Sequence, residues 1–305
     1  MLSFINLRDY AIANRVDYNS ILSVTKKNIT NNRKKLSVIV PAYGRESFSE
    51  PLFKSFLNAA KKSPVSVSFT LVEHSEIPLH ERICSSLGVN HIWIPKDDFE
   101  PFNKCLAMNI GSLIVEGEEY IFHDLDCLVQ SNFFSNLYSN INSKESEAIQ
   151  TFSDRRVLYL DRNLTYRVLN DDLDIDSLKE GPRDERDPGY NGVTPPGLFG
   201  APGGSIWIKS GLFFRVGGYD ANLFFGYSPE DIFFWNKVCA ISKMDTCTDP
   251  RVEIFHMKHP LTENSNPHAP KLHELHRVFA ERCSQDEKEQ FIKLQEKFIK
   301  EAINE

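Results

Sequence analysis

The sequence predicts an α/β fold in which a mostly parallel central sheet carries helices on both faces. Short apolar segments of strand length alternate with amphipathic segments of helix length through the first 130 residues. Parallel strands need a crossover between them, usually a helix, so this alternation is typical of a parallel sheet. The 305 residues are 41% apolar and 25% charged, as in a globular protein large enough to bury a substantial core.

Each expected element has its own boundary signal. The expected strands cover residues 36–40, 65–72, 91–94 and 120–122, and the helices between them cover 46–61, 79–87 and 102–115. Pro41 and Pro95 stop the first and third strands, and β-branched residues are frequent in the second. Apolar residues recur at helical spacing along one side of 46–61, and Gly88 closes the second helix.

Three further segments surround this pattern. Residues 1–35 read as an N-terminal extension that contains a helix, and residues 263–305 as a charged, helical C-terminal tail. Residues 167–197 are acidic and poor in apolar side chains, which is typical of a long exposed loop. The main domain is therefore expected to span residues 36–262.

The charge and the missing motifs argue against several classes of protein. A formal net charge of −7 does not fit a general nucleic-acid binder, which is normally basic. No apolar run reaches the length of a membrane span and the N-terminus has no signal-peptide core, so we expect a cytoplasmic protein, with peripheral membrane association left open. Neither a GxGxxG turn nor a GxxxxGK[ST] loop is present, which argues against a dinucleotide Rossmann site and a P-loop.

Two aspartates follow the fourth expected strand. Alternate residues of a strand point the same way, so we expect the carboxylates of Asp124 and Asp126 on one side, where they repel each other unless a cation lies beside them. Mg²⁺ and Mn²⁺ take oxygen ligands of this kind. Aspartates are also common in turns, so turn and capping chemistry is the alternative. Residues 41–45 and Glu73 also follow strands, and ligands bind at this edge of open α/β sheets.

Further candidate site residues stand at the ends of elements in the second half. They are Gly203 and Gly204 before a strand, Glu230 and Asp231 at the start of a helix, and His256 and His259 at the end of a strand. Acids near a helix N-terminus also occur simply because they stabilise the helix dipole. Lone histidines are usually structural, but a pair at a strand end can supply neutral nitrogen ligands.

Six segments in a fixed order carry a family resemblance. They are residues 41–45, residues 102–104 together with 109–111, residues 123–126, residues 203–204, residues 226–231 and residues 256–259. In this order they resemble the motifs of nucleotide-sugar glycosyltransferases of the GT-A fold, especially the β-1,4-galactosyltransferase group and the bacterial galactosaminyltransferase and chondroitin-synthase-type modules. Ser228-Pro229 replaces two glycines of that pattern, Tyr227 replaces a tryptophan, and His256 replaces a methionine.

The resemblance implies a GT-A domain with a nucleotide-binding half over residues 36–130 and an acceptor and catalytic half over residues 131–262. It implies a UDP-sugar donor, Mn²⁺ or Mg²⁺ as cofactor, and a saccharide or lipid-linked saccharide as acceptor. The residues expected to bind the donor are Pro41, Tyr43, Arg45, Glu73, Phe102, Asn103, Lys104, Asp124, Gly203, Gly204 and Tyr227. The expected metal ligands are Asp126 and His259, with His256 and Asp124 as further candidates.

The resemblance also implies a reaction. Asp231 is expected to be the general base and Glu230 to bind the donor or acceptor sugar, in a single displacement that inverts the anomeric centre. The transferred group is expected to be a hexose or N-acetylhexosamine, with galactose or N-acetylgalactosamine favoured, in the synthesis of surface polysaccharide. Three alternatives stay open: a retaining transferase of the same fold, a metal-dependent nucleotide-sugar hydrolase or nucleotidyltransferase, and a non-catalytic sugar-binding module.

Overall fold

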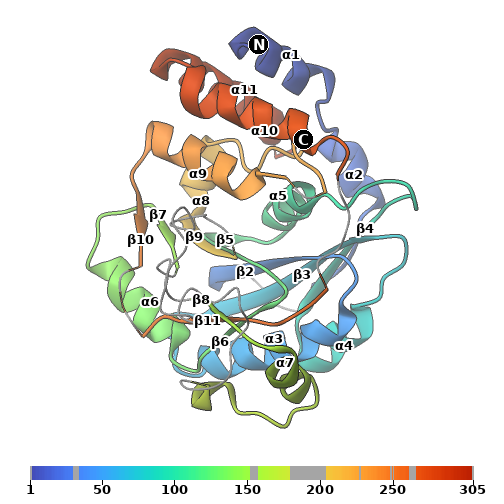
Figure 1. Ribbon diagram of the computed structural model, residues 1–305, viewed down its shortest axis with the longest axis vertical. Helices are drawn as coiled ribbons and strands as arrows, with labels where there is room; N and C mark the ends of the chain where they lie inside the picture. Colours follow the sequence, from blue (N-terminus) through green and yellow to red (C-terminus); the bar gives the residue numbers. More distant parts are fainter. Residues whose placement is uncertain are drawn as a thin grey trace.

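A computed structural model describes residues 2–29, 34–151, 157–178, 204–226, 228–247, 249, 251–260 and 266–303. Within these residues an eight-stranded sheet forms the centre of the molecule, with helices on both faces (Figure 1). Its strands, in order across the sheet, are β1 (Lys26–Asn28), β4 (Asn90–Pro95), β3 (Val67–Ser75), β2 (Lys34–Ala42), β5 (Gly117–His123), β9 (Ser205–Lys209), β7 (Ala148–Gln150) and β10 (Met244–Thr246). The central strands β4, β3, β2 and β5 are parallel, whereas β1 and β9 pair antiparallel. The predicted α/β fold with a mostly parallel sheet is confirmed.

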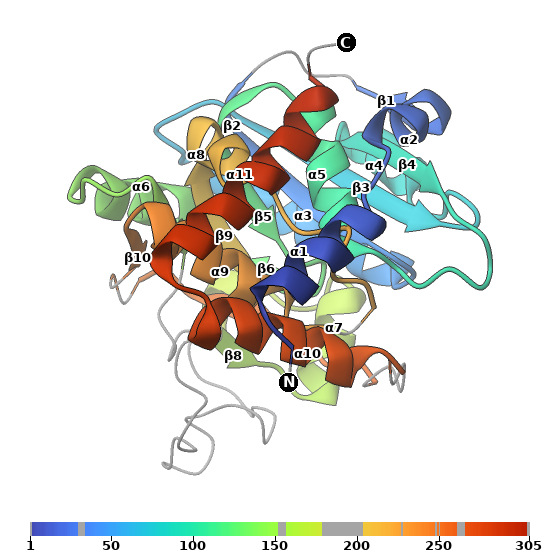
Figure 2. The same ribbon diagram turned by 90° about the horizontal axis from the view of Figure 1, so that it is seen from above.

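Each face of the sheet has its own hydrophobic core, because successive residues of a strand point to opposite faces. In β2, Ile39 belongs to one core, whereas Val38 and Val40 belong to the other. The first core is covered by α1 (Phe4–Ala13), α2 (Tyr18–Val24), α5 (Lys104–Ile114), α8 (Ser210–Arg215), α9 (Glu230–Ile241), α10 (Ala269–Arg277), the π-helix η2 (Val278–Arg282) and α11 (Gln285–Glu301). The second is covered by α3 (Glu46–Ala60), α4 (Glu81–Leu87), α6 (Phe133–Asn142), α7 (Arg162–Leu169) and the short 3₁₀ helix η1 (Ile175–Ser177). Figure 2 shows α11 lying across α8 and α9.

A second, three-stranded sheet brings two distant parts of the chain together. The short strand β6 (Cys127–Val129) pairs antiparallel with β11 (Ile254–His256), and β11 pairs in parallel with β8 (Val157–Tyr159). The register places His256 opposite Cys127, the residue that follows Asp126. The Met257 amide also donates to the Asp126 carbonyl at 2.8 Å. Backbone pairing therefore holds the histidine segment beside the aspartates.

Buried polar contacts join the turn before α9 to both α5 and α9. Asn109 of α5 donates to the Tyr219 carbonyl at 2.7 Å and accepts from the Tyr219 amide at 2.9 Å. Lys237 of α9 is fully buried, lies 2.7 Å from the Asp220 carboxylate and donates to a backbone carbonyl. Because a buried charge is costly without a partner, this ion pair fixes the position of α9 relative to the turn before it.

The predicted strands and helices of residues 36–122 are all present, with one consequential difference. β3 continues to Ser75 instead of ending at Val72, so Glu73 lies inside a strand rather than after one. The strands of the second sheet were not predicted, because three residues give no recognisable period. In the described part of the chain no helix is long and apolar enough to cross a membrane.

Candidate metal and nucleotide-sugar site

Arg45 enters the site from the turn between β2 and α3. Gly44 and Arg45 both have positive φ (58° and 57°), a conformation that costs a non-glycine residue about 1–2 kcal/mol. The buried ring of His80 supports this turn, with Nε2 3.1 Å from the Gly44 carbonyl and Nδ1 2.6 Å from Ser49 Oγ. The turn directs the Arg45 guanidinium at Asp126, so that Nη1 lies 2.7 Å from Oδ2.

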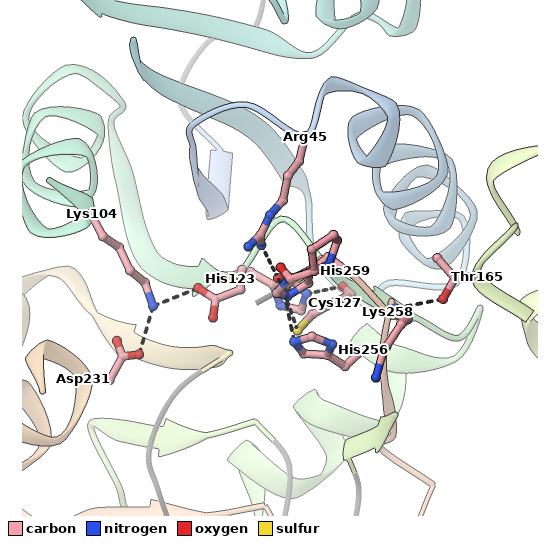
Figure 3. Close-up of polar contacts among 12 residues, drawn as sticks. Arg45, Lys104, His123, Cys127, Thr165, Asp231, His256, Lys258 and His259 are labelled. Carbon is pink, nitrogen blue, oxygen red and sulfur yellow. Dashed lines mark hydrogen bonds and ion pairs between the residues drawn. The ribbon is translucent and has the colours of Figure 1, made fainter. Parts of the chain in front are cut away.

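Asp126 lies at the centre of a group of nitrogen atoms. His259 Nε2 lies 3.2 Å from its Oδ2, and His256 Nε2 lies 3.7 Å from its Oδ1. Figure 3 shows the two imidazoles beside each other, with Arg45 extending toward them from the turn before α3 at the top of the view. Burial favours a raised pKa for Asp126, but the charge of His256, the hydrogen bond from His259 and the charge of Arg45 hold the pKa well below its usual range.

The three side chains of Asp126, His256 and His259 fit a divalent metal ion. Their ligand atoms all lie within 4.8 Å of one another. His259 Nδ1 lies 2.8 Å from the Pro260 carbonyl, which can only accept, so Nδ1 carries a proton. His259 Nε2 faces the Asp126 carboxylate at 3.2 Å, and a divalent ion between these two atoms would take the place of the proton in that contact. One carboxylate and two imidazoles form a mixed donor set that suits divalent transition metals.

Asp124 serves a different cation from Asp126. β5 ends before the pair, and residues 124–126 form a turn, so the alternation of an extended strand does not apply to them. Strand alternation therefore gives no reason to place both carboxylates on one side, and each carboxylate has its own cationic partner. Asp124 Oδ1 lies 2.9 Å from Lys104 Nζ, which lies 2.9 Å from Asp231 Oδ2 and 3.6 Å from Glu230 Oε1. Lys104 thus connects the aspartate turn to the two acids of α9.

Both acids of α9 have raised pKa values, and the pKa of Glu230 lies near neutral pH. Burial and the charge of Asp231 raise the pKa of Glu230 to about 7. Burial also raises the pKa of Asp231, although Lys104 opposes this effect. Burial disfavours the charged form of Lys104, but the three surrounding carboxylates outweigh it and hold the pKa of Lys104 well above its usual value. The charged lysine therefore faces a pair of acids that titrate as a coupled unit.

Three of the predicted donor-binding residues belong to the framework beneath the site. Pro41 is buried within β2, and Asn103 caps α5 by accepting from the Leu106 amide at 2.8 Å. Glu73 is fully buried, with Oε1 accepting from the Leu79 amide at 2.8 Å and Oε2 2.9 Å from His91 Nε2. The prediction that Glu73 contacts the nucleotide is wrong, because its carboxylate is enclosed by protein donors.

An aromatic pair stands at the rim of the site. The rings of Tyr43 and Phe102 are stacked, with centroids 5.7 Å apart and planes 13° from parallel. Lys96 Nζ lies 5.0 Å from the Tyr43 centroid, and the tyrosine is 40% exposed. Stacked aromatic rings provide flat apolar surface of the kind that binds a nucleobase. The expectation that both residues contact the donor stays a prediction.

The glycine pair and Tyr227 are only partly within the described chain. Gly204 lies beside the aspartate turn, where its carbonyl accepts from the Asp124 amide at 2.8 Å. Gly203 and Tyr227 lie outside the described residues, so their predicted roles stay predictions.

Two buried histidines shape the site although neither had a predicted role of its own. His80 supports the turn of Arg45, and His123 lies below the aspartate turn with Nε2 2.6 Å from the Cys127 carbonyl. Burial lowers the pKa of His123 to about 4, so the ring is neutral at physiological pH. No spacing signal could have identified them, because each acts on a segment that only the folded chain brings near.

Comparisons with known proteins support the fold. No family model matches the chain, and no curated protein matches its sequence. Among solved structures, residues 1–349 of TarS from S. aureus in complex with UDP are 14% identical, with a TM-score of 0.51 over 85% of this chain and 69% of that one. The catalytic domain of Drosophila β1,4-galactosyltransferase 7 with xylobiose is 12% identical, with a TM-score of 0.47 over 84% of each chain. Glucosyl-3-phosphoglycerate synthase from Mycobacterium tuberculosis, solved with Mn²⁺, UDP and glucosyl-3-phosphoglycerate, is 14% identical, with a TM-score of 0.45 over 91% of this chain and 81% of that one.

The likeness to TarS shows the fold of this chain, which is that of the GT-A glycosyltransferases, as the sequence resemblance predicted.

Proposed function

We propose that the protein is a metal-dependent glycosyltransferase that uses a UDP-sugar. The observation that carries the proposal is the division of the site into two adjoining charge centres. Asp126 with His256 and His259 forms a metal-binding group, and Asp124, Lys104 and Asp231 form a connected group of charged side chains next to it. A nucleotide sugar carries a diphosphate next to the reacting carbon of its sugar. The metal-binding group would face the diphosphate, and the group of charged side chains would face the reacting carbon.

The donor side of the proposal rests on charge and shape. A bound Mn²⁺ or Mg²⁺ supplies positive charge that stabilises the diphosphate leaving group. Asp126, His256 and His259 would hold the ion, while the guanidinium of Arg45 and the ammonium of Lys104 are placed to bind phosphate oxygens or the donor sugar. The Tyr43–Phe102 pair would bind the uracil ring.

The acceptor side of the proposal rests on the acids of α9. The attacking hydroxyl must lose a proton as the new bond forms, and a carboxylate within hydrogen-bond reach can accept it. Asp231 is the proposed base, because its raised pKa makes it a better proton acceptor than an ordinary aspartate. Glu230, which accepts from Ser228 Oγ at 3.0 Å, would bind a sugar hydroxyl. Direct displacement on this plan inverts the anomeric centre.

The finer parts of the proposal follow the family resemblance alone. They are a hexose or N-acetylhexosamine as the transferred group, with galactose or N-acetylgalactosamine favoured, a saccharide or lipid-linked saccharide acceptor, and a role in surface polysaccharide synthesis. The proposed cytoplasmic location rests instead on the sequence, in which no apolar run reaches the length of a membrane span. NMR of the product distinguishes inversion from retention, so the stereochemical outcome can be tested independently of the other parts.

The first test replaces the proposed base. Asp231→Asn should lower kcat by about 10²–10⁴-fold, since general-base catalysis contributes that much, while Mn²⁺-dependent UDP binding is kept. UDP-sugars are screened with Mn²⁺ and short saccharides, and UDP release and product are measured for both proteins. Transfer at the wild-type rate by the variant would show that another group is the base.

The same screen separates the alternatives. UDP release that needs no acceptor and yields free sugar points to a hydrolase. UDP binding with neither transfer nor hydrolysis of any sugar nucleotide points to a non-catalytic module.

A further inference from the structure

We propose that the Arg45 guanidinium neutralises Asp126 in place of the metal ion as long as no ligand is bound. When the donor binds, Arg45 moves to the diphosphate and the metal ion can bind Asp126, so that metal and nucleotide strengthen each other's binding. This inference rests on the proposed function, because it concerns how the same site is loaded. It assigns to Arg45 a role in metal affinity as well as its contact with the donor.

The first observation is that Arg45 and His259, a member of the metal-binding group, face the same oxygen of Asp126. Asp126 Oδ2 lies 2.7 Å from Arg45 Nη1 and 3.2 Å from His259 Nε2. An ion held by Asp126 and the two histidines would lie beside the guanidinium. Two cations at that separation repel, and the repulsion is strong where burial excludes water.

The second observation is that no other carboxylate competes for Arg45 among the residues that the structure describes. Asp124, the other acid of the turn, is 2.9 Å from Lys104, and Lys104 also contacts the acids of α9. Asp126 is the one ion-pair partner found for Arg45 in the described part of the chain. Each aspartate of the turn therefore has its own resident cation, and Figure 3 shows Lys104 and Arg45 approaching from separate elements.

The third observation is that Arg45 is held at its base but can turn at its tip. Its backbone is fixed in a left-handed conformation by the supported turn, whereas its side chain is 31% exposed. A long side chain anchored in this way can leave Asp126 for a phosphate oxygen without movement of the backbone. Guanidinium groups bind phosphate in a two-pronged geometry, so the exchange replaces one charge-assisted contact by another.

The consequence is a reciprocal coupling between the two ligands. Without a diphosphate, the metal must compete with Arg45 for Asp126. With a diphosphate present, Arg45 has a new partner and the metal site is released. By thermodynamic linkage, UDP then strengthens Mn²⁺ binding by the same factor by which Mn²⁺ strengthens UDP binding.

The test measures Mn²⁺ binding directly, by the loss of the EPR signal of free Mn²⁺, with and without saturating UDP. In Arg45→Gln the Mn²⁺ affinity without UDP should rise by about tenfold, and the gain that UDP produces should shrink by a similar factor. Arg45→Lys keeps the charge and should bind Mn²⁺ in the absence of UDP about as the wild type does. Arg8→Gln on α1 makes the same change in net charge at an exposed position and should change neither affinity.

The outcomes separate this inference from the proposed function. Unchanged or weaker Mn²⁺ binding by Arg45→Gln without UDP would overturn the exchange and leave Arg45 as a residue that only orders Asp126. If the wild type binds neither Mn²⁺ nor UDP, even when both are present, the proposed function itself fails. Arg45→Gly removes the same charge and also relieves the left-handed backbone, so it provides the measurement if the Gln variant is unstable.

Discussion

Glu230 and Asp231 are adjacent acids in a buried setting, and their titration depends on how many negative charges that setting can hold. Lys104 supplies one positive charge to Asp124, Asp231 and Glu230 together. One cation cannot neutralise three carboxylates, so protonating Glu230 is the least costly way to reduce the excess negative charge. The acid–base behaviour of the site is therefore set by local charge balance.

This balance predicts a pH dependence of stability. The pKa of Glu230 is raised from 4.5 to about 7 in the folded chain, so the folded state binds this proton more tightly than the unfolded chain does. The stabilisation is fully present below the unfolded value and is lost as the pH rises through about 7. The free energy of unfolding, measured with urea, should therefore fall across this window in the wild type.

Glu230→Gln should reduce this slope, because an amide does not titrate. Part of the slope should remain, since the pKa of Asp231 is raised as well. Glu118→Gln, at an exposed position of β5, changes the same charge and should keep the wild-type slope. Identical slopes for the wild type and Glu230→Gln would contradict the proposed charge balance.

At the level of elements, the turn between α8 and α9 depends on close approach of two backbones. Gly217 has a φ of 77°, and a Cβ at this position would lie 2.5 Å from the backbone of Gln295 in α11. α11 covers the first core with buried apolar residues such as Phe291 and Ile299. The turn and the C-terminal helix can therefore pack only if residue 217 has no side chain.

Gly217→Ala should lower the free energy of unfolding by about 2–4 kcal/mol, because it combines backbone strain with a steric clash. Gly211→Ala is the matched control within α8, since nothing lies within 4 Å of its added Cβ. That variant should be neutral or more stable by about 0.5–1 kcal/mol. Urea unfolding of both variants checks the comparison, and equal stabilities would show that α11 can move away from the turn.

Prediction from sequence succeeded for elements with a strong local pattern. The segment 36–40 is apolar and β-branched and forms β2, and 46–61 repeats apolar residues at helical spacing and forms α3. It failed where local pattern carries no information. The end of β3 was placed too early, because Glu73 is a charged residue that only tertiary partners can bury.

The same limit applies to the site. Asp126, His256 and His259 could be named from residue type and order, and the structure brings them together. The separation of Asp124 from Asp126 could not be predicted, because it depends on a turn whose shape is set by His123 and by pairing with β11. The three-residue strands of the second sheet are too short to be recognised before the fold is known.

At the scale of the whole molecule, the net charge disfavours binding of the anion that the site is proposed to hold. The chain carries a net charge of −7, and a nucleotide diphosphate is also an anion. The fold offsets this negative charge at the site, because it directs Arg45 and Lys104 from separate elements to one edge of the sheet. A metal ion held by Asp126 and the histidines would add further positive charge there, so the proposed donor should bind only when the metal is present.

Thermal unfolding with UDP, with and without Mn²⁺, tests this dependence most directly. At UDP concentrations about 100 times Kd, the Tm of the wild type should rise by roughly 3–8 °C in the presence of Mn²⁺ and should not change when EDTA replaces it. Asp126→Asn should lose the rise, because it removes the carboxylate shared by the two histidines. An equal rise with EDTA, or no rise with Mn²⁺, would contradict a metal-dependent nucleotide-sugar site.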